Sequence, residues 1–382
     1  MDNKKLGIYV HIPFCKSKCG YCDFCSHPPL EKETERYMNA LMLNIQDFSG
    51  AAEPYSVDTV FIGGGTPTML SKKQMKELVG CIRSSFSVEK DAEFTVEANP
   101  GTVDKRYLSS LVNMGINRIS FGLQSANDNE LRALGRIHTR DEFLQSYKAA
   151  RAAGFKNINV DLMYGIPEQT KESFENTLRF VKDLAPEHIS VYGLKIEEGT
   201  PFYERKELLP LPDEESEYRM YREAHTSLSS AGYKHYEISN FARRGYESRH
   251  NMRYWRDELY LGFGVSAHSY FGGQRYAYTD DIEKYIGEME APKNIADILS
   301  ECSDIDVFTQ ETEFVMLRLR LFDGLVLSEY RKEFGRDFLS KYGDRIKRFV
   351  DGGFMSLDGT HLAFTVKGMY VSNYILSEIL DF

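Results

Sequence analysis

The chain has 382 residues, a formal net charge of −10 and a share of apolar residues, 42%, that is ordinary for a soluble globular protein. The acidic balance argues against a general electrostatic grip on nucleic acid or on anionic lipid. No apolar run approaches the ~20 residues of a membrane-spanning helix. The N-terminus lacks the long apolar core of a signal peptide. We therefore expect a cytoplasmic protein without a nucleic-acid partner.

Short β-rich apolar runs alternate with amphipathic helical segments over residues 1–200. This alternation predicts parallel strands joined by right-handed helical crossovers. Two helical segments, 71–86 and 139–155, have clear patterns, and the second is predicted to stop at Gly154. The six units predict an α/β fold with a partial (β/α)6 barrel of the TIM type, short of the full eight units. The predicted strands cover residues 6–12, 57–65, 93–100, 117–125, 157–165 and 188–195.

The pattern fades after about residue 200, and a compact second module is predicted near the C-terminus. It has several helices, then a hairpin with Asp358-Gly359 at its turn, and a last helix. Helices followed by a hairpin suggest a winged-helix-like module, for which the acidic chain favours a packing or partner role. Its predicted helices cover 309–322, 328–334 and 337–350. The expected domains are the barrel, 1–235, a connecting region, 236–304, and the C-terminal module, 305–382.

Four of the six cysteines lie in the stretch CKSKCGYCDFC, residues 15–25, and Cys15, Cys19 and Cys22 have the spacing C-x3-C-x2-C. In a reducing compartment, clustered cysteines more often bind metal or take part in catalysis than form disulfides. Three thiolates can hold three irons of a 4Fe–4S cluster and leave the fourth iron open. Zinc usually takes two C-x2-C pairs, or one pair with histidines, so a zinc-stabilised module is a weaker alternative.

Polar or glycine residues follow the ends of successive predicted strands, where barrel active sites lie. The loop Gly63-Gly64-Gly65-Thr66-Pro67 follows the second strand, and its glycines would let backbone amides approach a ligand closely. Each position alone fits a tight turn, a solvated loop or a barrel ion pair. Together they favour a cofactor site. The remaining candidates are Tyr9 on the first strand, Glu97, Gln124 and Asp161 on the third to fifth, and Arg136.

The three-cysteine motif, with Tyr21 just before its last cysteine, resembles the radical S-adenosylmethionine superfamily. In that superfamily the open iron chelates the amino and carboxylate groups of S-adenosylmethionine. An electron from the cluster can then cleave the sulfonium to a 5′-deoxyadenosyl radical. The resemblance implies a 4Fe–4S cluster on Cys15, Cys19 and Cys22 and S-adenosylmethionine as cofactor.

Further segments resemble one family, formed by oxygen-independent coproporphyrinogen III dehydrogenase (HemN) and its paralogue, the heme chaperone HemW. These are YVHIPFCKSKCGYCDF, FIGGGTPTML, VEANP, FGLQS, GRIHT and NVDLMYGIP. The resemblance covers nearly the whole chain and implies that Tyr9, Gly64 and Glu97 contact one S-adenosylmethionine. The dehydrogenase places a second molecule near the positions of Tyr21, Gly65, Thr66, Gln124, Arg136 and Asp161. Whether two molecules bind here is left open.

Three features resemble the chaperone more than the dehydrogenase. Eight residues precede Tyr9, where the dehydrogenase has an N-terminal extension, and Phe24 stands at the position of the dehydrogenase's fourth cysteine. The segments YEISNFA and HNMRYW also resemble chaperone signatures. The H-N-x-x-Y-W pattern implies that His250 binds heme, with Tyr254 and Trp255 packed on the porphyrin. A hydrogen-bonded core histidine is the alternative, and His268 is a second candidate.

The resulting prediction is a heme chaperone that uses a 4Fe–4S cluster and S-adenosylmethionine and transfers heme to a heme-requiring acceptor. Its expected partners are that acceptor and an electron donor, and it is a candidate homodimer. Dehydrogenase activity is not expected, and no catalytic residue is assigned. The alternative is the dehydrogenase itself, in which the radical abstracts hydrogen from propionate side chains of coproporphyrinogen III. Loss of carbon dioxide then gives protoporphyrinogen IX.

Overall fold

The structure, a computed structural model, describes residues 4–291 and 295–380. Six strands in its centre lie side by side in chain order, and each pairs in parallel with the next. All six expected strands are confirmed, with small shifts at their ends. They are β1 (Lys4–Ile12), β2 (Tyr55–Gly64), β3 (Val88–Ala98), β4 (Arg118–Gln124), β5 (Asn157–Tyr164) and β6 (His188–Gly193).

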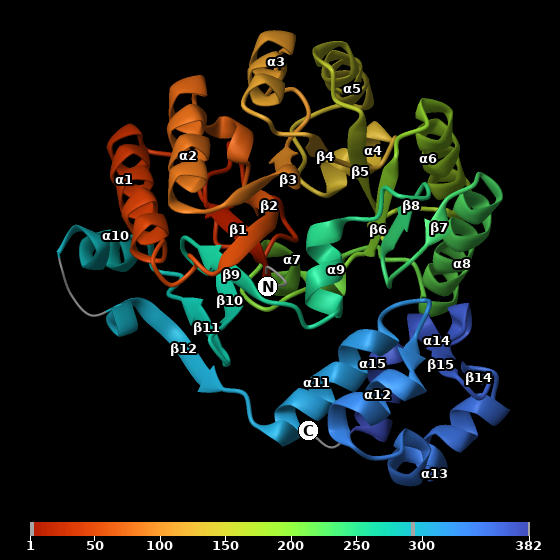
Figure 1. Ribbon diagram of the computed structural model, residues 1–382. Helices are drawn as coiled ribbons and strands as arrows, with labels where there is room; N and C mark the ends of the chain where they lie inside the picture. The colour runs from red at the N-terminus through yellow and green to blue at the C-terminus, as the bar shows by residue number, and fades with distance from the viewer. Residues whose placement is uncertain (1–3, 292–294, 381–382) are drawn as a thin grey trace.

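Helices connect these strands and lie along the outer side of the curved sheet (Figure 1). Both expected helices are confirmed as α2 and α5, and Gly154 ends α5 in the left-handed conformation, with φ 108°. Because helices cover its outer face, the sheet is buried on both sides, and every residue of β4 is buried. The connections contain α1 (Glu31–Asp47), α2 (Lys72–Ser85), α3 (Lys105–Asn113), α4 (Asp128–Ala133), α5 (Arg140–Ala153) and α6 (Lys171–Leu184), with a 3-10 turn at Pro67–Met69.

The region between the barrel and the C-terminal module adds strands to both edges of the same sheet. On one edge β9 pairs in parallel with β1, and antiparallel strands β10 to β12 follow; on the other, β8 and β7 extend from β6. These strands were not predicted. They are β7 (Lys234–His235), β8 (Asn240–Ala242), β9 (Tyr260–Phe263), β10 (His268–Phe271), β11 (Gln274–Tyr278) and β12 (Leu299–Asp304).

The strand order runs linearly from β12 to β7, so the sheet described here is an open arc. This agrees with the expected partial barrel. Because β1 to β6 are parallel, their carboxyl ends all lie at the same edge of the sheet. Helices α7 (Pro201–Glu204), α8 (Glu214–Ser230), α9 (Arg249–Trp255) and α10 (Ile282–Glu290) complete this part, with 3-10 turns at Lys206–Leu208 and Ile295–Ile298. In the part of the chain that the structure describes, no helix has the length and apolar character needed to span a bilayer.

The C-terminal module packs beside α8 and α9, on the open side of the arc (Figure 1). It contains the expected helices and the β14–β15 hairpin, whose turn includes Gly359 with φ 87°. Strand β13, which pairs with β15, and the break of the last helix into two are the differences from the prediction. The elements are α11 (Val307–Leu319), β13 (Leu325–Val326), α12 (Leu327–Phe334), α13 (Phe338–Asp351), β14 (Met355–Leu357), β15 (His361–Phe364), α14 (Val366–Tyr370) and α15 (Ser372–Ile379).

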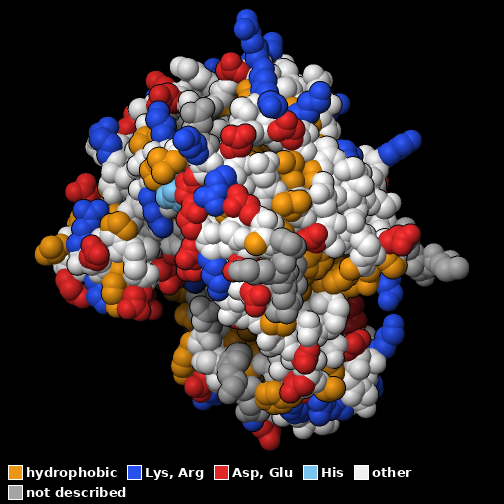
Figure 2. All heavy atoms as spheres, turned by 90° about the vertical axis from the view of Figure 1, so that its left-hand side faces the viewer, with side chains coloured by type: hydrophobic (Ala, Val, Ile, Leu, Met, Phe, Trp, Pro, Cys, Tyr) orange, Lys and Arg blue, Asp and Glu red, His pale blue; other side chains and the backbone are white. Residues whose placement is uncertain are grey.

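Acidic and basic side chains are interspersed over the face that carries α1 and α10, and no single basic patch covers that face (Figure 2). This mixture accords with the acidic composition of the chain.

Candidate cofactor site

A cavity of about 960 Å³ lies at the carboxyl ends of the parallel strands. This volume is near the upper end of the range for small-molecule sites. Its walls come from the cysteine loop, the strand ends and the C-terminal module, so it joins three parts of the chain. Most of the predicted site residues line it: Cys15, Cys19, Tyr21, Cys22, Gly64, Gly65, Glu97, Gln124, Arg136 and Asp161.

The cysteine loop is closed at its base by two backbone hydrogen bonds. The amide of Cys15 donates to the carbonyl of His27 at 2.9 Å, and the amide of His27 donates to that of Pro13 at 3.0 Å. Between these points, Cys19 and Cys22 are linked by a 3.3 Å backbone hydrogen bond, and all three motif cysteines are free thiols. The loop therefore presents three thiols to one cavity, the donor set that an iron–sulfur cluster requires.

The three thiols do not meet at a single point. Among residues 4–291 and 295–380, no three His, Cys, Asp or Glu side chains converge to hold one metal ion. A cubane cluster does not demand such convergence, because each cysteine binds a different iron. The donor set of three cysteines on one cavity fits a three-cysteine cluster more readily than a structural zinc site, which takes four protein ligands.

Arg136 lies directly beside the cluster loop. One guanidinium nitrogen, Nη1, is 3.6 Å from the sulfur of Cys19. The other, Nη2, donates to the Asn99 side chain and to the Gly122 carbonyl, both at 2.8 Å. These contacts fix the position of the side chain, and its positive charge favours negatively charged groups at this end of the cavity.

The glycine loop after β2 passes close to the end of β1. Gly64 has φ 106°, and a Cβ atom there would lie 2.6 Å from the His11 ring; at Gly65 it would lie 2.8 Å from the Phe14 carbonyl. Both positions therefore require glycine for close packing. The amide of Gly64 donates to Glu97 Oε2 at 3.1 Å, which ties the loop to the next strand.

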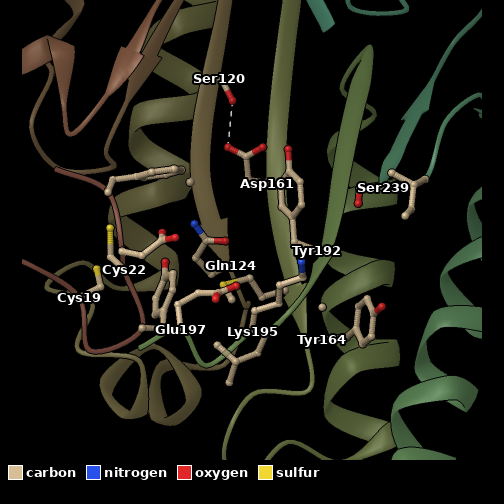
Figure 3. A pocket seen from close by; sticks show the side chains of 18 of the residues that line it. Cys19, Cys22, Ser120, Gln124, Asp161, Tyr164, Tyr192, Lys195, Glu197 and Ser239 are labelled. Carbon is tan, nitrogen blue, oxygen red and sulfur yellow. Dashed lines mark hydrogen bonds between the residues drawn. The ribbon is translucent and has the colours of Figure 1, made fainter. Parts of the chain in front are cut away.

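Two half-buried carboxyl groups, Glu97 on β3 and Asp161 on β5, lie toward the strand ends. Burial, reinforced by the charge of Asp161, raises the pKa of Glu97 to about 8. Burial also raises the pKa of Asp161, which accepts hydrogen bonds from Ser120 at 2.9 Å and Asn159 at 2.7 Å (Figure 3). A cationic ligand would stabilise the ionised form of both carboxyl groups.

Residues 9–181 match the model of the Radical SAM superfamily, and residues 309–371 match that of the HemN C-terminal domain. The "Heme chaperone HemW" of Bacillus subtilis (strain 168) is 35% identical over 97% of this chain and 98% of its own length. The chain belongs to the HemW family of the radical SAM superfamily. The HemW protein of Escherichia coli (strain K12) is 37% identical, with 85% of each chain covered.

A solved structure of coproporphyrinogen III oxidase (HemN) from Escherichia coli, described as a radical SAM enzyme, shares the fold. Its TM-score is 0.87 at 25% identity, and the match covers 98% of this chain and 90% of that one. The expected fold class and family are thus confirmed. Membership of the radical SAM superfamily implies a 4Fe–4S cluster and S-adenosylmethionine, and the thiols, glycine loop and carboxyl groups described above fit both.

Two further predicted cofactor residues of this HemW-family chain lie next to the cavity without lining it. The hydroxyl of Tyr9 is 3.0 Å from His11 Nδ1, and its ring stacks on Phe61. The Thr66 hydroxyl is 3.4 Å from the Cys15 sulfur and accepts from the Asn99 side chain at 2.6 Å. Thr66 therefore contacts two residues of the cavity wall, Cys15 and Asn99, and the predicted contacts of Tyr9 and Thr66 with cofactor stay predictions.

His250 lies on α9, which packs against β2 inside the arc of the sheet (Figure 1), and is 1% exposed. Its Nδ1 is 2.9 Å from the Thr59 hydroxyl and its Nε2 is 2.8 Å from the Tyr254 hydroxyl, so both ring nitrogens are engaged. Burial lowers the pKa of His250 to about 3, which keeps the ring neutral. The geometry favours the alternative of a hydrogen-bonded core histidine, and heme ligation by His250 stays a prediction. His268, on β10, is exposed and lies 3.4 Å from Glu301.

Sequence reasoning missed most of the wall opposite the cysteines. Figure 3 shows this wall across the cavity from Cys19 and Cys22, with Tyr164, Tyr192 and Ser239 on it. Its remaining part comes from Trp255 and from the C-terminal module. Long-range packing creates most of this wall; Tyr164 and Tyr192 lie on predicted strands, and Trp255 belongs to the H-N-x-x-Y-W motif.

Proposed function

We propose that this protein is a heme chaperone, which binds heme and transfers it to a heme-requiring acceptor. The observation that carries the proposal is the extent of the cavity. It runs from the cluster loop to the C-terminal module and is lined by polar groups at one end and by apolar and aromatic side chains at the other. The name of the relatives, heme chaperone HemW, supports the same function.

The polar end would hold the cluster and S-adenosylmethionine. Cys15, Cys19 and Cys22 would bind three irons, and the open iron would take the cofactor. The amide-rich loop at Gly64 and the carboxyl group of Glu97 suit its polar and cationic groups. When bound, the cluster supplies an electron that can cleave S-adenosylmethionine. The residues that would contact cofactor also include Tyr9, Tyr21, Gly65, Thr66, Gln124, Arg136 and Asp161.

The apolar end would hold the macrocycle. Ile238, Met316, Leu317 and Met369 line it, and Trp255 adds a large aromatic surface. Apolar and aromatic side chains of this kind favour a flat hydrophobic ligand, since its burial removes apolar area from water. The cluster and S-adenosylmethionine would then regulate binding or transfer of heme at the other end of one continuous cavity.

The alternative is an enzyme that oxidatively decarboxylates coproporphyrinogen III, because the fold closely matches that of HemN. The residue at one position argues against dehydrogenase activity. Phe24, which stands where the dehydrogenase has its fourth cysteine, lines the cavity and is 58% exposed. The exposed ring occupies a place at the cluster end where the dehydrogenase has a thiol.

The remaining partners are part of the proposal. The protein would act in the cytoplasm with an electron donor for the cluster and with a heme-accepting protein, and a homodimer is its proposed assembly. The domain division at residues 235 and 304 also stays a proposal. Strands β8 to β12 of the connecting region pair within the barrel's sheet, so this region would fold together with the barrel.

Heme titration of the full chain tests the proposal. The cluster is reconstituted anaerobically, and heme absorbance is followed as heme is added with and without S-adenosylmethionine. We expect saturable binding with a fixed stoichiometry. Heme that binds only in proportion to its concentration, without saturation, would overturn the proposal.

His250→Ala in the same titration decides the role of that histidine. A ligand role predicts a changed absorption spectrum and weaker binding of heme. A core role predicts an unchanged spectrum and a lower melting temperature, because the variant leaves Thr59 and Tyr254 without their partner.

A further inference from the structure

Two residues that line the cavity beside the C-terminal module carry hydrogen-bond donors without a partner among the described residues. The Tyr221 hydroxyl and the Trp255 Nε1–H are buried and make no hydrogen bond to any of the described residues. Both residues line the cavity, and Tyr221 is only 4% exposed. A buried donor without a partner costs free energy, so such groups in a native protein usually serve a ligand or an ordered water. Two of them in one cavity point to a ligand with acceptor atoms.

A cation lies at the same end. Arg320, which directly follows α11, lines the cavity and is half-buried. Its Nη1 donates to the Ser372 hydroxyl at 3.0 Å and its Nη2 donates to the Asn373 side chain at 2.5 Å. Both acceptors are neutral, and no carboxylate of the described chain lies within ion-pair distance. Since a guanidinium has five N–H donors, three remain for a ligand.

The carboxyl group that acts electrostatically on Arg320 is Glu237, which forms no ion pair with it and whose Oε1 has no hydrogen-bond partner among the described residues. Its Oε2 accepts from the amide of Ser239 at 3.2 Å, and burial raises the pKa of Glu237 to about 7. Burial, only partly offset by Glu237, lowers the pKa of Arg320, as expected for a cation that lacks a direct counter-ion. An anionic group of a ligand would supply that counter-ion.

Arg320 and Trp255 are brought together by packing of the C-terminal module on the barrel. Helix α11 packs on α9, and Arg318 Nη1 donates to the carbonyl of Trp255 at 2.8 Å. Just after α11, the backbone of Leu321 forms an isolated antiparallel β-bridge with the backbone of Glu237. The guanidinium and the indole N–H are therefore held on the two sides of the same interface. Met316 and Met369 add apolar surface to the lining of the same cavity.

We propose that Arg320, with the donors of Trp255 and Tyr221, binds the carboxylate side chains of a tetrapyrrole whose macrocycle lies between the barrel rim and the C-terminal module. This inference rests on the proposed function and extends it, because it assigns the propionate site. It also gives the C-terminal module a role as one wall of the heme site. Arginine suits this role, since its planar fork pairs with carboxylates through two parallel hydrogen bonds.

The test compares heme with heme dimethyl ester, which has the same macrocycle but no carboxylates. Wild-type protein should bind heme at least about tenfold more tightly than the ester, as a charge-assisted pair predicts. Arg320→Gln should lose most of that preference and bind both ligands similarly. Arg331→Gln, in the same module but paired with Asp337 on its surface, is the matched control and should keep the preference.

Trp255→Phe gives a second test that leaves Arg320 and its contacts with α15 intact. It keeps an aromatic ring but removes the N–H, so the preference for heme should fall by a smaller factor. S-adenosylmethionine affinity, measured in parallel, should not change in either variant, because the cofactor's carboxylate would lie at the cluster end.

The outcomes separate this inference from the proposed function. Absence of saturable heme binding in the wild type contradicts the proposed function itself. Saturable binding with an undiminished preference for heme in Arg320→Gln overturns the propionate site alone. If Arg320→Gln does not fold, as its melting curve would reveal, an undiminished preference in Trp255→Phe overturns it.

Discussion

At the scale of single residues, the role of Cys25 decides whether the loop is a three-thiol or a four-thiol cluster site. Its sulfur donates to the carbonyl of Asp280 at 3.2 Å, and its own carbonyl is 3.0 Å from His11 Nε2. Cys25 is thus hydrogen-bonded to other segments of the same chain, at Asp280 and His11. It does not line the cavity that the other three cysteines of the loop line. It has a structural role at the edge of the site.

We expect Cys25→Ser to retain its iron and its visible absorption after anaerobic reconstitution, because the three cluster thiols are unchanged. Cys22→Ser should lose both. Iron content and the absorption spectrum of the two variants provide the measurement. A Cys25→Ser protein that cannot hold iron would mean that the loop uses four thiolates and leaves no open iron.

Glu97 predicts a pH dependence of stability. In the folded protein it keeps its proton up to pH about 8, whereas in the unfolded chain it ionises near 4.5. Between these values the folded state binds more protons, so this residue makes the free energy of unfolding fall as pH rises. Above pH 8 its contribution no longer changes.

Glu97→Gln removes the part of the fall in the free energy of unfolding that comes from ionisation of Glu97. Its melting temperature relative to wild type should therefore rise between pH 5 and 8, while its affinity for S-adenosylmethionine should fall, since a neutral amide attracts a cation less. Glu77→Gln, at a partly exposed position on α2, serves as the control. A constant difference between the melting temperatures of wild type and Glu97→Gln across this range would rule out the Glu97 carboxyl group as the cause.

At the scale of elements, the C-terminal module has a buried charge cluster of its own. Glu311 on α11 is 1% exposed and accepts hydrogen bonds from Tyr330 and Tyr342. Its other oxygen pairs with Arg336 and with Lys341. Burial raises the pKa of Glu311, but these hydrogen bonds and positive charges outweigh it and lower the pKa overall. Three helices are thereby held by one carboxylate.

Glu311→Gln should destabilise this module by about 2 kcal/mol, less than the loss of a fully buried pair because both cations are partly exposed. Hydrogen exchange would report it as faster exchange in α11 to α13, with β1 to β6 unaffected. Glu329→Gln, at an exposed position on α12, should leave exchange unchanged. Equal exchange rates in Glu311→Gln and Glu329→Gln would contradict a stabilising role of Glu311 in this module.

The elements found from sequence are those with a strong local pattern. Strands β1 to β6 have long apolar runs, and α5 has both a capping box at Thr139 and a terminal Gly154. Strands β7 to β12 are two to six residues long and pair mainly at the edges of the sheet, so their sequence carries little periodic signal. Strand β13 has two residues and depends on its partner β15.

At the scale of the whole molecule, the sequence located the cluster end of the cavity, but only Trp255 at the other end. Cys15, Cys19 and Cys22 are close in sequence, and Gly64 and Gly65 stand in a recognisable loop. Arg320, in contrast, reaches the cavity only because the C-terminal module packs against α9. The H-N-x-x-Y-W motif predicted heme contacts for His250, Tyr254 and Trp255, and of these three only Trp255 lines the cavity. Tertiary packing decides which residues of a motif reach a cavity.

The central claim is that this cavity holds heme for delivery and does not decarboxylate a porphyrinogen. The most direct test supplies the anaerobically reconstituted full chain with reductant, S-adenosylmethionine and coproporphyrinogen III, and titrates the same preparation with heme. The account predicts saturable heme binding and no more than stoichiometric protoporphyrinogen IX. Sustained turnover, with many product molecules formed per chain, would contradict it and identify the protein as the dehydrogenase.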